Sequence, residues 1–198
     1  METRERIIKA SVDLFYKKGF AKASIRDLVK VLKLTNAAVY NHFKNKDHLL
    51  YVIAKRMGNI YFDSMNDISV QYDNPLDKIK AFIHNHTALA VKNRKAVKVF
   101  FDDLGQLSPK YQKTILDHQR DMYNLFKMQL NDLEKMGLLR PVNKTLATYC
   151  CFGMLNWSYR WFKKNKGLSV EDVGAGIVDI FLNGILNRER MNENTKPV

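Results

Sequence analysis

The sequence predicts an all-α protein of about nine helices, and three observations support this fold class. Apolar residues recur at spacings of three and four along most of the chain. Capping residues mark the helix starts, and a proline follows two of them, at Asn74 with Pro75 and at Ser108 with Pro109. No segment alternates apolar and polar residues with turn dipeptides between copies, so no sheet is predicted.

The composition is typical of a soluble globular protein. The 198 residues suffice for one or two domains, and 46% of them are hydrophobic and 27% charged. The N-terminus is too charged for a signal peptide, and no apolar run approaches the roughly 20 residues that span a bilayer. We therefore expect a cytoplasmic protein without a membrane partner.

The only two cysteines, Cys150 and Cys151, are adjacent in an apolar stretch. A disulfide scaffold is excluded by this number, and buried free thiols are expected. A vicinal redox pair is the alternative.

The net charge of +13 favours a polyanionic partner. Residues 1 to 50 contain eleven Lys or Arg and five Asp or Glu, so this quarter of the chain carries nearly half of the excess. Nucleic acid is therefore the expected partner. An anionic membrane surface is less favoured, because no basic amphipathic helix stands apart from a core.

Three short helices are predicted in the N-terminal quarter of the chain. The first runs from about residue 3 to Lys18 and ends at Gly19. Ser24 caps the second, with Asp27 placed to complete a capping box, and Thr35 caps the third. Such closely spaced helices are typical of a helix-turn-helix.

The third predicted helix has an unusual face of polar and small residues. Its large apolar candidates are few, which leaves Asn36, Ala37, Ala38, Asn41 and His42 for another surface. A helix that enters a DNA major groove needs such a face, because small and amide side chains reach base edges that bulky apolar groups would block. An ordinary surface helix is the alternative interpretation.

Six further helices are predicted after the helix-turn-helix. A long one, from Asn45 to about Tyr72, would join two domains. The others span residues 74–93, 97–104, 108–137, 143–165 and 169–186, and residues 187–198 form a polar tail.

No catalytic or metal-binding motif is found. The five histidines include no HExxH pattern, and His84 and His86 are two residues apart, on different faces of a helix. There is no GxSxG elbow and no Walker sequence. We therefore expect neither an enzyme nor a metal or cofactor site.

Residues 3 to 50 resemble the DNA-binding domain of TetR-family regulators. The segments IIKASVDLFYKKGF and ASIRDLVKVLKLTNAAVYNHFKNKDHLL carry this resemblance, with its Tyr-x-His/Tyr-Phe-x-x-Lys pattern. It implies a DNA-binding domain over residues 1–47 and a ligand-binding and dimerisation domain over residues 48–186. One departure is Lys33, where the family commonly has glycine in the turn, so either this position is strained or the turn differs.

The resemblance also implies which residues face DNA: Thr35, Asn36, Ala37, Ala38, Tyr40, Asn41 and His42. Amide side chains can pair with base edges, alanines can touch a thymine methyl, and Tyr40 and His42 can donate to phosphates. Lys46 would clamp a phosphate, and Lys44 and Arg26 would add affinity without sequence preference. Tyr40 could instead belong to the core, and Arg26 to a solvated face.

The second half of the chain resembles the subgroup of TetR-type repressors that respond to acyl-CoA thioesters and control fatty-acid or sterol degradation. The matching segments are FFDDLGQLSPKYQKTILDHQRDMYNLFKMQL, MGLLRP and GMLNWSYRWFKKNKGLSVEDV with the closing FLNGI. An acyl-CoA site requires an apolar channel with cations at its mouth.

Two sets of residues could form such a site. The apolar set is Phe100, Phe101, Met122, Tyr123, Phe126, Leu130, Tyr149, Phe152 and Trp157. The cationic set is Arg120, Lys127, Arg160, Lys163, Lys164 and Lys166. A solid core and ordinary surface charges are the alternatives.

The resemblance thus predicts a homodimeric repressor that reads a palindromic operator in double-stranded DNA. The last two helices would form the dimer interface, and a small hydrophobic effector, an acyl-CoA, would release the DNA. Two alternatives stay open: a regulator of efflux that responds to another hydrophobic metabolite or drug, and a sequence-nonspecific DNA-compacting protein.

Overall fold

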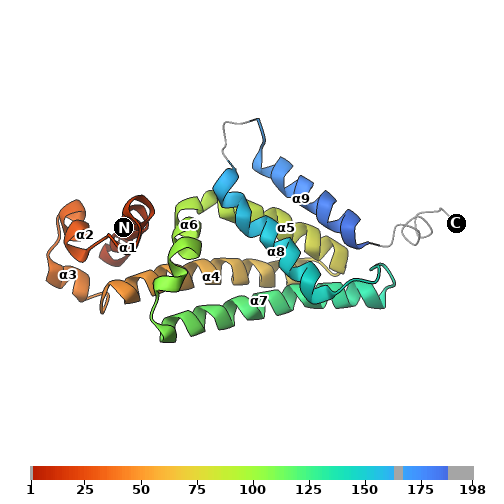
Figure 1. The fold of residues 1–198 in the computed structure, drawn as a ribbon, viewed down its shortest axis with the longest axis horizontal. Helices are drawn as coiled ribbons and strands as arrows, with labels where there is room; N and C mark the ends of the chain where they lie inside the picture. Colours follow the sequence, from red (N-terminus) through yellow and green to blue (C-terminus); the bar gives the residue numbers. More distant parts are fainter. Residues whose placement is uncertain (1, 163–166, 187–198) are drawn as a thin grey trace. The chain divides into compact units, whose positions relative to one another are not determined.

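The computed structural model describes residues 2–162 and 167–186, and this part of the chain is helical (Figure 1). Its nine α-helices confirm the predicted all-α class. The first four are α1 (Thr3–Lys18), α2 (Ile25–Leu32), α3 (Asn36–Tyr40) and α4 (Lys46–Gln71). The others are α5 (Pro75–Lys92), α6 (Arg94–Asp103), α7 (Pro109–Lys135), α8 (Lys144–Trp161) and α9 (Val170–Ile185), with a short 3-10 helix, Leu104–Gln106, before α7.

Predicted caps set several of the helix starts. The side chains of Ser24, Thr35, Asn143 and Ser169 each accept a backbone N–H of the first turn that follows. These bonds satisfy donors that have no partner inside the helix. Two boundaries differ from the prediction, because α6 begins at Arg94 and not at Val97, and α8 ends at Trp161 and not near residue 165. The predicted polar tail, residues 187–198, lies outside the described residues.

The helices are grouped in two compact units, each with its own core. Unit 1 contains residues 1–60 and 93–118, and unit 2 contains residues 61–92 and 119–198. Both α4 and α7 therefore begin in unit 1 and end in unit 2. The boundary predicted at residue 47 separates DNA binding from ligand binding and dimerisation, and it stays a prediction.

The core of unit 1 holds the short helices in place. The rings of Phe15 and Phe20 meet edge to face at 5.2 Å, which joins the end of α1 to the loop before α2. Val39 is the inward residue of α3, and Phe43 follows it in the loop to α4; both are almost fully buried. Since a helix of five residues is not stable alone, these two side chains anchor α3.

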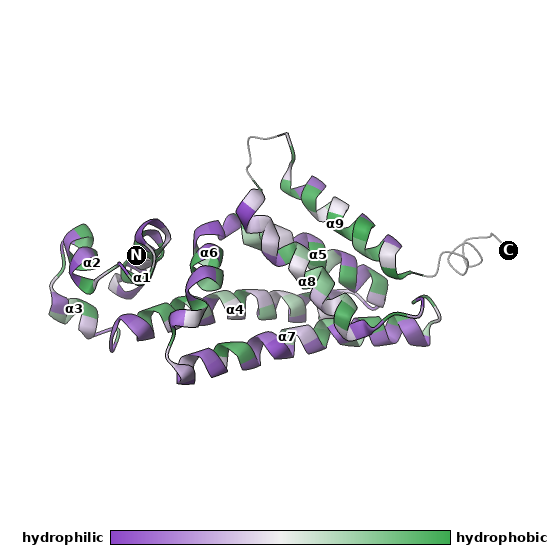
Figure 2. Cartoon of the chain, viewed as in Figure 1, coloured by the Kyte–Doolittle hydropathy of each residue, from purple (hydrophilic) through white to green (hydrophobic). Residues whose placement is uncertain are grey.

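The core of unit 2 is built from one face of each of its helices. Phe82 on α5, Phe126 on α7 and Phe152 on α8 have ring centroids 5.2 to 5.5 Å apart. Helix α9 is rich in apolar residues along its length (Figure 2) and packs on α5 and α8. A Cβ added at Gly174 would lie 2.6 Å from Nδ1 of His84, so glycine permits the close approach of α9 to α5.

The two cysteines differ in their surroundings. Cys151 is buried as predicted, but Cys150 is exposed, so the prediction of two buried thiols is wrong for Cys150. The reason is geometric, since neighbouring residues on a helix are about 100° apart and need not share a face. Burial raises the pKa of the Cys151 thiol, with the neighbouring Cys150 adding to the effect.

None of the helices within residues 2–162 and 167–186 combines the length and the apolar character needed to cross a membrane.

Candidate nucleic-acid interface and ligand core

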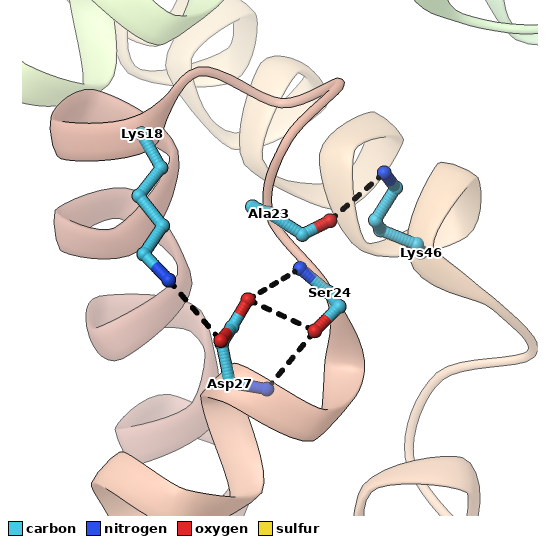
Figure 3. Close-up of polar contacts among 5 residues, drawn as sticks. All are labelled: Lys18, Ala23, Ser24, Asp27 and Lys46. Carbon is cyan, nitrogen blue, oxygen red and sulfur yellow. Dashed lines mark hydrogen bonds and ion pairs between the residues drawn. The ribbon is translucent and has the colours of Figure 1, made fainter.

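The start of α2 is fixed by a capping box between Ser24 and Asp27 (Figure 3). The backbone N–H of Asp27 donates to Oγ of Ser24 at 3.1 Å, and the backbone N–H of Ser24 donates to Oδ2 of Asp27 at 3.0 Å. Nζ of Lys18, at the end of α1, lies 3.1 Å from Oδ1 of the same carboxylate. The end of α1 is thus tied to the first turn of α2.

These contacts stabilise the charged form of Asp27. The hydroxyl of Ser24 is the largest cause of its lowered pKa, followed by Lys18 and by the backbone N–H of Ser24. Because the folded-state pKa lies below the unfolded value, this contribution to stability is present above the ordinary pKa of an aspartate. It is lost as the pH falls through the lowered value.

Lys46 joins the first turn of α4 to the loop between α1 and α2. Its Nζ donates to the carbonyl oxygen of Phe20 at 2.9 Å and to that of Ala23 at 3.0 Å, the latter drawn in Figure 3. The ammonium also lies 4.2 Å from the centre of the Phe20 ring. The predicted phosphate clamp is therefore a structural residue as well, and of its three N–H donors two are used inside the protein.

The turn between α2 and α3 is made by Lys33 in a left-handed conformation. Among the described residues it is the only non-glycine with a positive φ, at 53°. Its backbone N–H still donates to the carbonyl of Val29, which closes α2. The strain expected from the absence of glycine is thus located at one residue.

The outward face of α3 contains most of the residues predicted to face DNA. Asn36, Ala37, Tyr40 and the following Asn41 and His42 are exposed, and Ala38 is half-buried. Tyr40 is 51% exposed, so the alternative that placed it in the core is wrong. Thr35 is exposed and caps the helix with its hydroxyl, which accepts the N–H of Ala38 at 3.1 Å. Arg26 on α2 and Lys44, between α3 and α4, are also exposed.

The sequence did not single out His48, which braces the segment between α3 and α4. Its Nδ1 accepts the backbone N–H of Lys44 at 3.2 Å, and its ring stacks on Tyr111 at 6.0 Å. Tyr111 in turn stacks on Tyr51 at 4.2 Å. Burial lowers the pKa of His48, and the nearby Lys44 and Arg4 lower it further while Asp47 opposes them.

The predicted ligand residues do not all lie together. Met122, Phe126, Leu130 and Phe152 are buried in the core of unit 2, and the partly buried Tyr123 packs against them. Phe100 and Phe101 lie on α6, which belongs to unit 1. Tyr149 and Trp157 are exposed on α8, at 58% and 57%, so their predicted interior position is wrong. Spacing alone did not show which face of α8 is buried.

The predicted cations lie at the surface or have partners. Nζ of Lys127 donates to Oγ1 of Thr145 at 2.6 Å. Nε of Arg160 donates to Oη of Tyr159 at 3.0 Å, and its guanidinium lies 4.7 Å from the Trp157 ring centre. Arg120 is exposed on α7. The remaining predicted cations, Lys163, Lys164 and Lys166, lie outside the described residues.

Two family models match this chain and together cover most of it. Residues 7–52 match the model described as bacterial regulatory proteins, tetR family. Residues 72–185 match the model described as tetracyclin repressor-like, C-terminal domain.

Individual relatives are distant in sequence and close in fold. The HTH-type transcriptional repressor KstR2 of Mycolicibacterium smegmatis is 23% identical, with 92% of this chain and 90% of the relative aligned. A tetR-family regulatory protein from Rhodococcus RHA1 superposes with a TM-score of 0.87 at 21% identity, covering 92% and 96% of the two chains. AibR in complex with isovaleryl coenzyme A and operator DNA gives a TM-score of 0.83 at 22% identity, covering 90% and 97%.

The two bonds of Lys46 generate a testable prediction. Lys46→Met keeps the apolar stem over Phe20 but leaves the carbonyls of Phe20 and Ala23 without their donor. We expect the free energy of unfolding to fall by about 1 to 3 kcal/mol, measured by urea denaturation at a fixed protein concentration. DNA affinity should fall with it.

The matched control for this prediction is Lys44→Met, because Lys44 is exposed and its ammonium holds no such bonds. This variant should unfold within about 0.5 kcal/mol of the wild type. Its DNA binding should be less sensitive to salt by about one unit of slope. Equal stability of the two variants would contradict a structural role for Lys46.

Proposed function

The chain belongs to the TetR family of transcriptional regulators, and from this premise we propose a homodimeric repressor that a fatty acyl-CoA releases from its operator. The genes under its control would be those of lipid degradation. The observation that carries the DNA-binding part is the exposed polar face of α3, which caps and buried anchors hold away from the core. Asn36 and Asn41 on this surface can pair with base edges in the major groove.

The dimeric part of the proposal is supported by an exposed apolar stripe on α8. Its members are spaced by three or four residues and are Leu146, Tyr149, Gly153, Trp157 and Trp161. Large apolar groups that share one exposed face mark an interaction surface. Ile180, on the exposed face of α9, is 67% accessible and extends the apolar surface of unit 2. A second copy would present two α3 helices to successive major grooves, which are about 34 to 36 Å apart.

The effector part rests on the composition of the unit 2 core. Phe82, Phe126 and Phe152 supply aromatic surface, and Met65 and Met122 are flexible side chains that can adapt to an apolar ligand. AibR, which shares this fold, was solved with a coenzyme A thioester and operator DNA. A regulator that responds to another hydrophobic metabolite or a drug is the second candidate, because the same core would accept either.

Two helices give ligand binding a route to the DNA-binding surface. Helix α4 begins with Lys46, which anchors the loop before α2, and its last residues lie in unit 2. Tyr111, in the first turn of α7, stacks on His48, and the last residues of α7 also lie in unit 2. The ligand would favour a dimer whose recognition helices are wrongly spaced, and it acts only through a difference in affinity between the two states.

The proposal is tested by effector release on a palindromic site selected from random DNA. Oleoyl-CoA should raise the apparent Kd for this site about tenfold or more, within the usual range of allosteric coupling, measured by fluorescence anisotropy. Coenzyme A alone, which lacks the acyl chain, is the control and should have little effect. Failure to select a palindromic site would reject the operator, and an unchanged Kd with oleoyl-CoA would reject the acyl-CoA.

The dimer interface makes a separate prediction. Trp157→Glu places a charge in the middle of the apolar stripe. The dissociation constant of the dimer should therefore rise about thirtyfold or more, as for the loss of a central aromatic contact. Sedimentation velocity measures this. The control is Met128→Glu, since Met128 is also exposed, at 54%, but lies on α7. Equal dimer dissociation constants in the two variants would show that the interface does not include the stripe on α8.

A further inference from the structure

A polar pair, His86 and Asn156, lies among aromatic rings in unit 2. His86 on α5 is only 3% exposed and is surrounded by aromatic rings. Tyr61 stacks on it with centroids 4.3 Å apart, and Phe82 and Phe152 meet it edge to face at 5.4 and 5.9 Å. Asn156 on α8 is its polar neighbour, with Oδ1 3.2 Å from Nε2. A buried imidazole in such surroundings is costly unless both of its nitrogens are used.

The hydrogen bonds of Asn156 determine the tautomer of His86. The side chain of Asn156 also bonds to the phenol of Tyr123, where it opposes the rise in pKa that burial and the nearby Tyr149 produce. Oδ1 of Asn156 faces Nε2 of His86, and an amide oxygen only accepts hydrogen bonds. Nε2 of His86 therefore carries the proton and donates to Asn156.

The other ring nitrogen of His86 is an acceptor without a donor. Nδ1 is buried and has no hydrogen-bond partner among the described residues. Burial also lowers the pKa of His86 to about 4, with the bond to Asn156 opposing it, so the ring is neutral near pH 7. A neutral acceptor attracts an O–H or N–H group and offers nothing to a carboxylate or a phosphate.

We propose that His86 is a specificity-determining residue of the effector site, which selects apolar ligands carrying a hydroxyl or amide N–H that donates to Nδ1. This inference rests on the proposed effector binding in unit 2 and narrows its chemistry. An acyl-CoA would meet the requirement through a hydroxylated chain or through the amide groups of its pantetheine arm.

The surroundings of His86 can make room for such a ligand. Met65 and Met122 belong to the same buried core, and Met154 packs against it. Unbranched methionine side chains change rotamer at low cost, so these are the side chains of the core that can best adapt to a ligand. The hydrogen bond to Nδ1 contributes more binding free energy than an ordinary one, because an unsatisfied buried acceptor receives its donor.

Two isomeric ligands test the inference on the full chain. 1-Decanol and methyl nonyl ether have the same atoms, but only the alcohol donates a hydrogen bond. Calorimetry should give the wild type a Kd for 1-decanol about tenfold below that for the ether. His86→Phe should bind both isomers with equal Kd. Tyr123→Phe, which frees the Asn156 amide to turn, should reduce the difference between the two Kd values.

The control is His84→Ala, because His84 is an exposed imidazole on the same helix and a smaller side chain does not crowd Gly174 on α9. This variant should keep the tenfold preference. Equal binding of the two isomers to the wild type, binding of neither, or an unchanged preference in folded His86→Phe would each overturn the inference.

A spectroscopic measurement covers the case in which His86→Phe does not fold. In the wild type labelled with ¹⁵N-histidine, the Nδ1 resonance of His86 should move toward a hydrogen-bonded position with 1-decanol and not with the ether. A resonance already at that position without ligand would show that a buried water satisfies Nδ1, and the inference would fail. Operator release by oleoyl-CoA tests the proposed function separately, so release without isomer preference rejects only the role of His86.

Discussion

The ammonium group of Lys46 donates hydrogen bonds to the carbonyl oxygens of Ala23 and Phe20, which precede it by 23 and 26 residues in the sequence. The rest of unit 1 depends on this constraint, because α2 and α3 are short and cannot hold their positions alone. Ala23 directly precedes the cap Ser24, so the lysine fixes the point at which α2 begins. Asp27 then connects the cap to Lys18 on α1. These contacts link α1, the start of α2 and the start of α4.

The same lysine lies in the first turn of α4, the helix that continues into unit 2. A change in unit 2 that moved α4 along or about its axis would act on the α1–α2 loop through Lys46. His48, in the same first turn, would transmit the movement to Lys44 and to the segment after α3. Helix α4 thus contains residues of unit 2 and also, in its first turn, the two residues that contact the DNA-binding segment.

Local rules in the sequence predicted the fold and much of the DNA-binding surface. The caps Ser24, Thr35 and Ser169 act through neighbours three residues away, so their partners were visible without a structure. Lys33 showed its strain by replacing the expected glycine. Faces of long helices were harder, because helical spacing assigned Trp157 and Phe152 to one interior although only Phe152 is buried. The bonds of Lys46 and the pairing of His86 with Asn156 span many residues, and no local pattern encodes them.

The central claim is that α3 is a reading surface and that the contacts around it only position it. Asn36 tests this most directly, because it is exposed in the first turn of α3 and its side chain takes part in none of the described caps. The measurement is the ratio of affinities for a selected palindromic site and for random DNA, in Asn36→Ala and in the wild type. If α3 reads bases, operator affinity falls about tenfold in Asn36→Ala while affinity for random DNA is unchanged. An equal fall on both DNAs would show that α3 does not read bases.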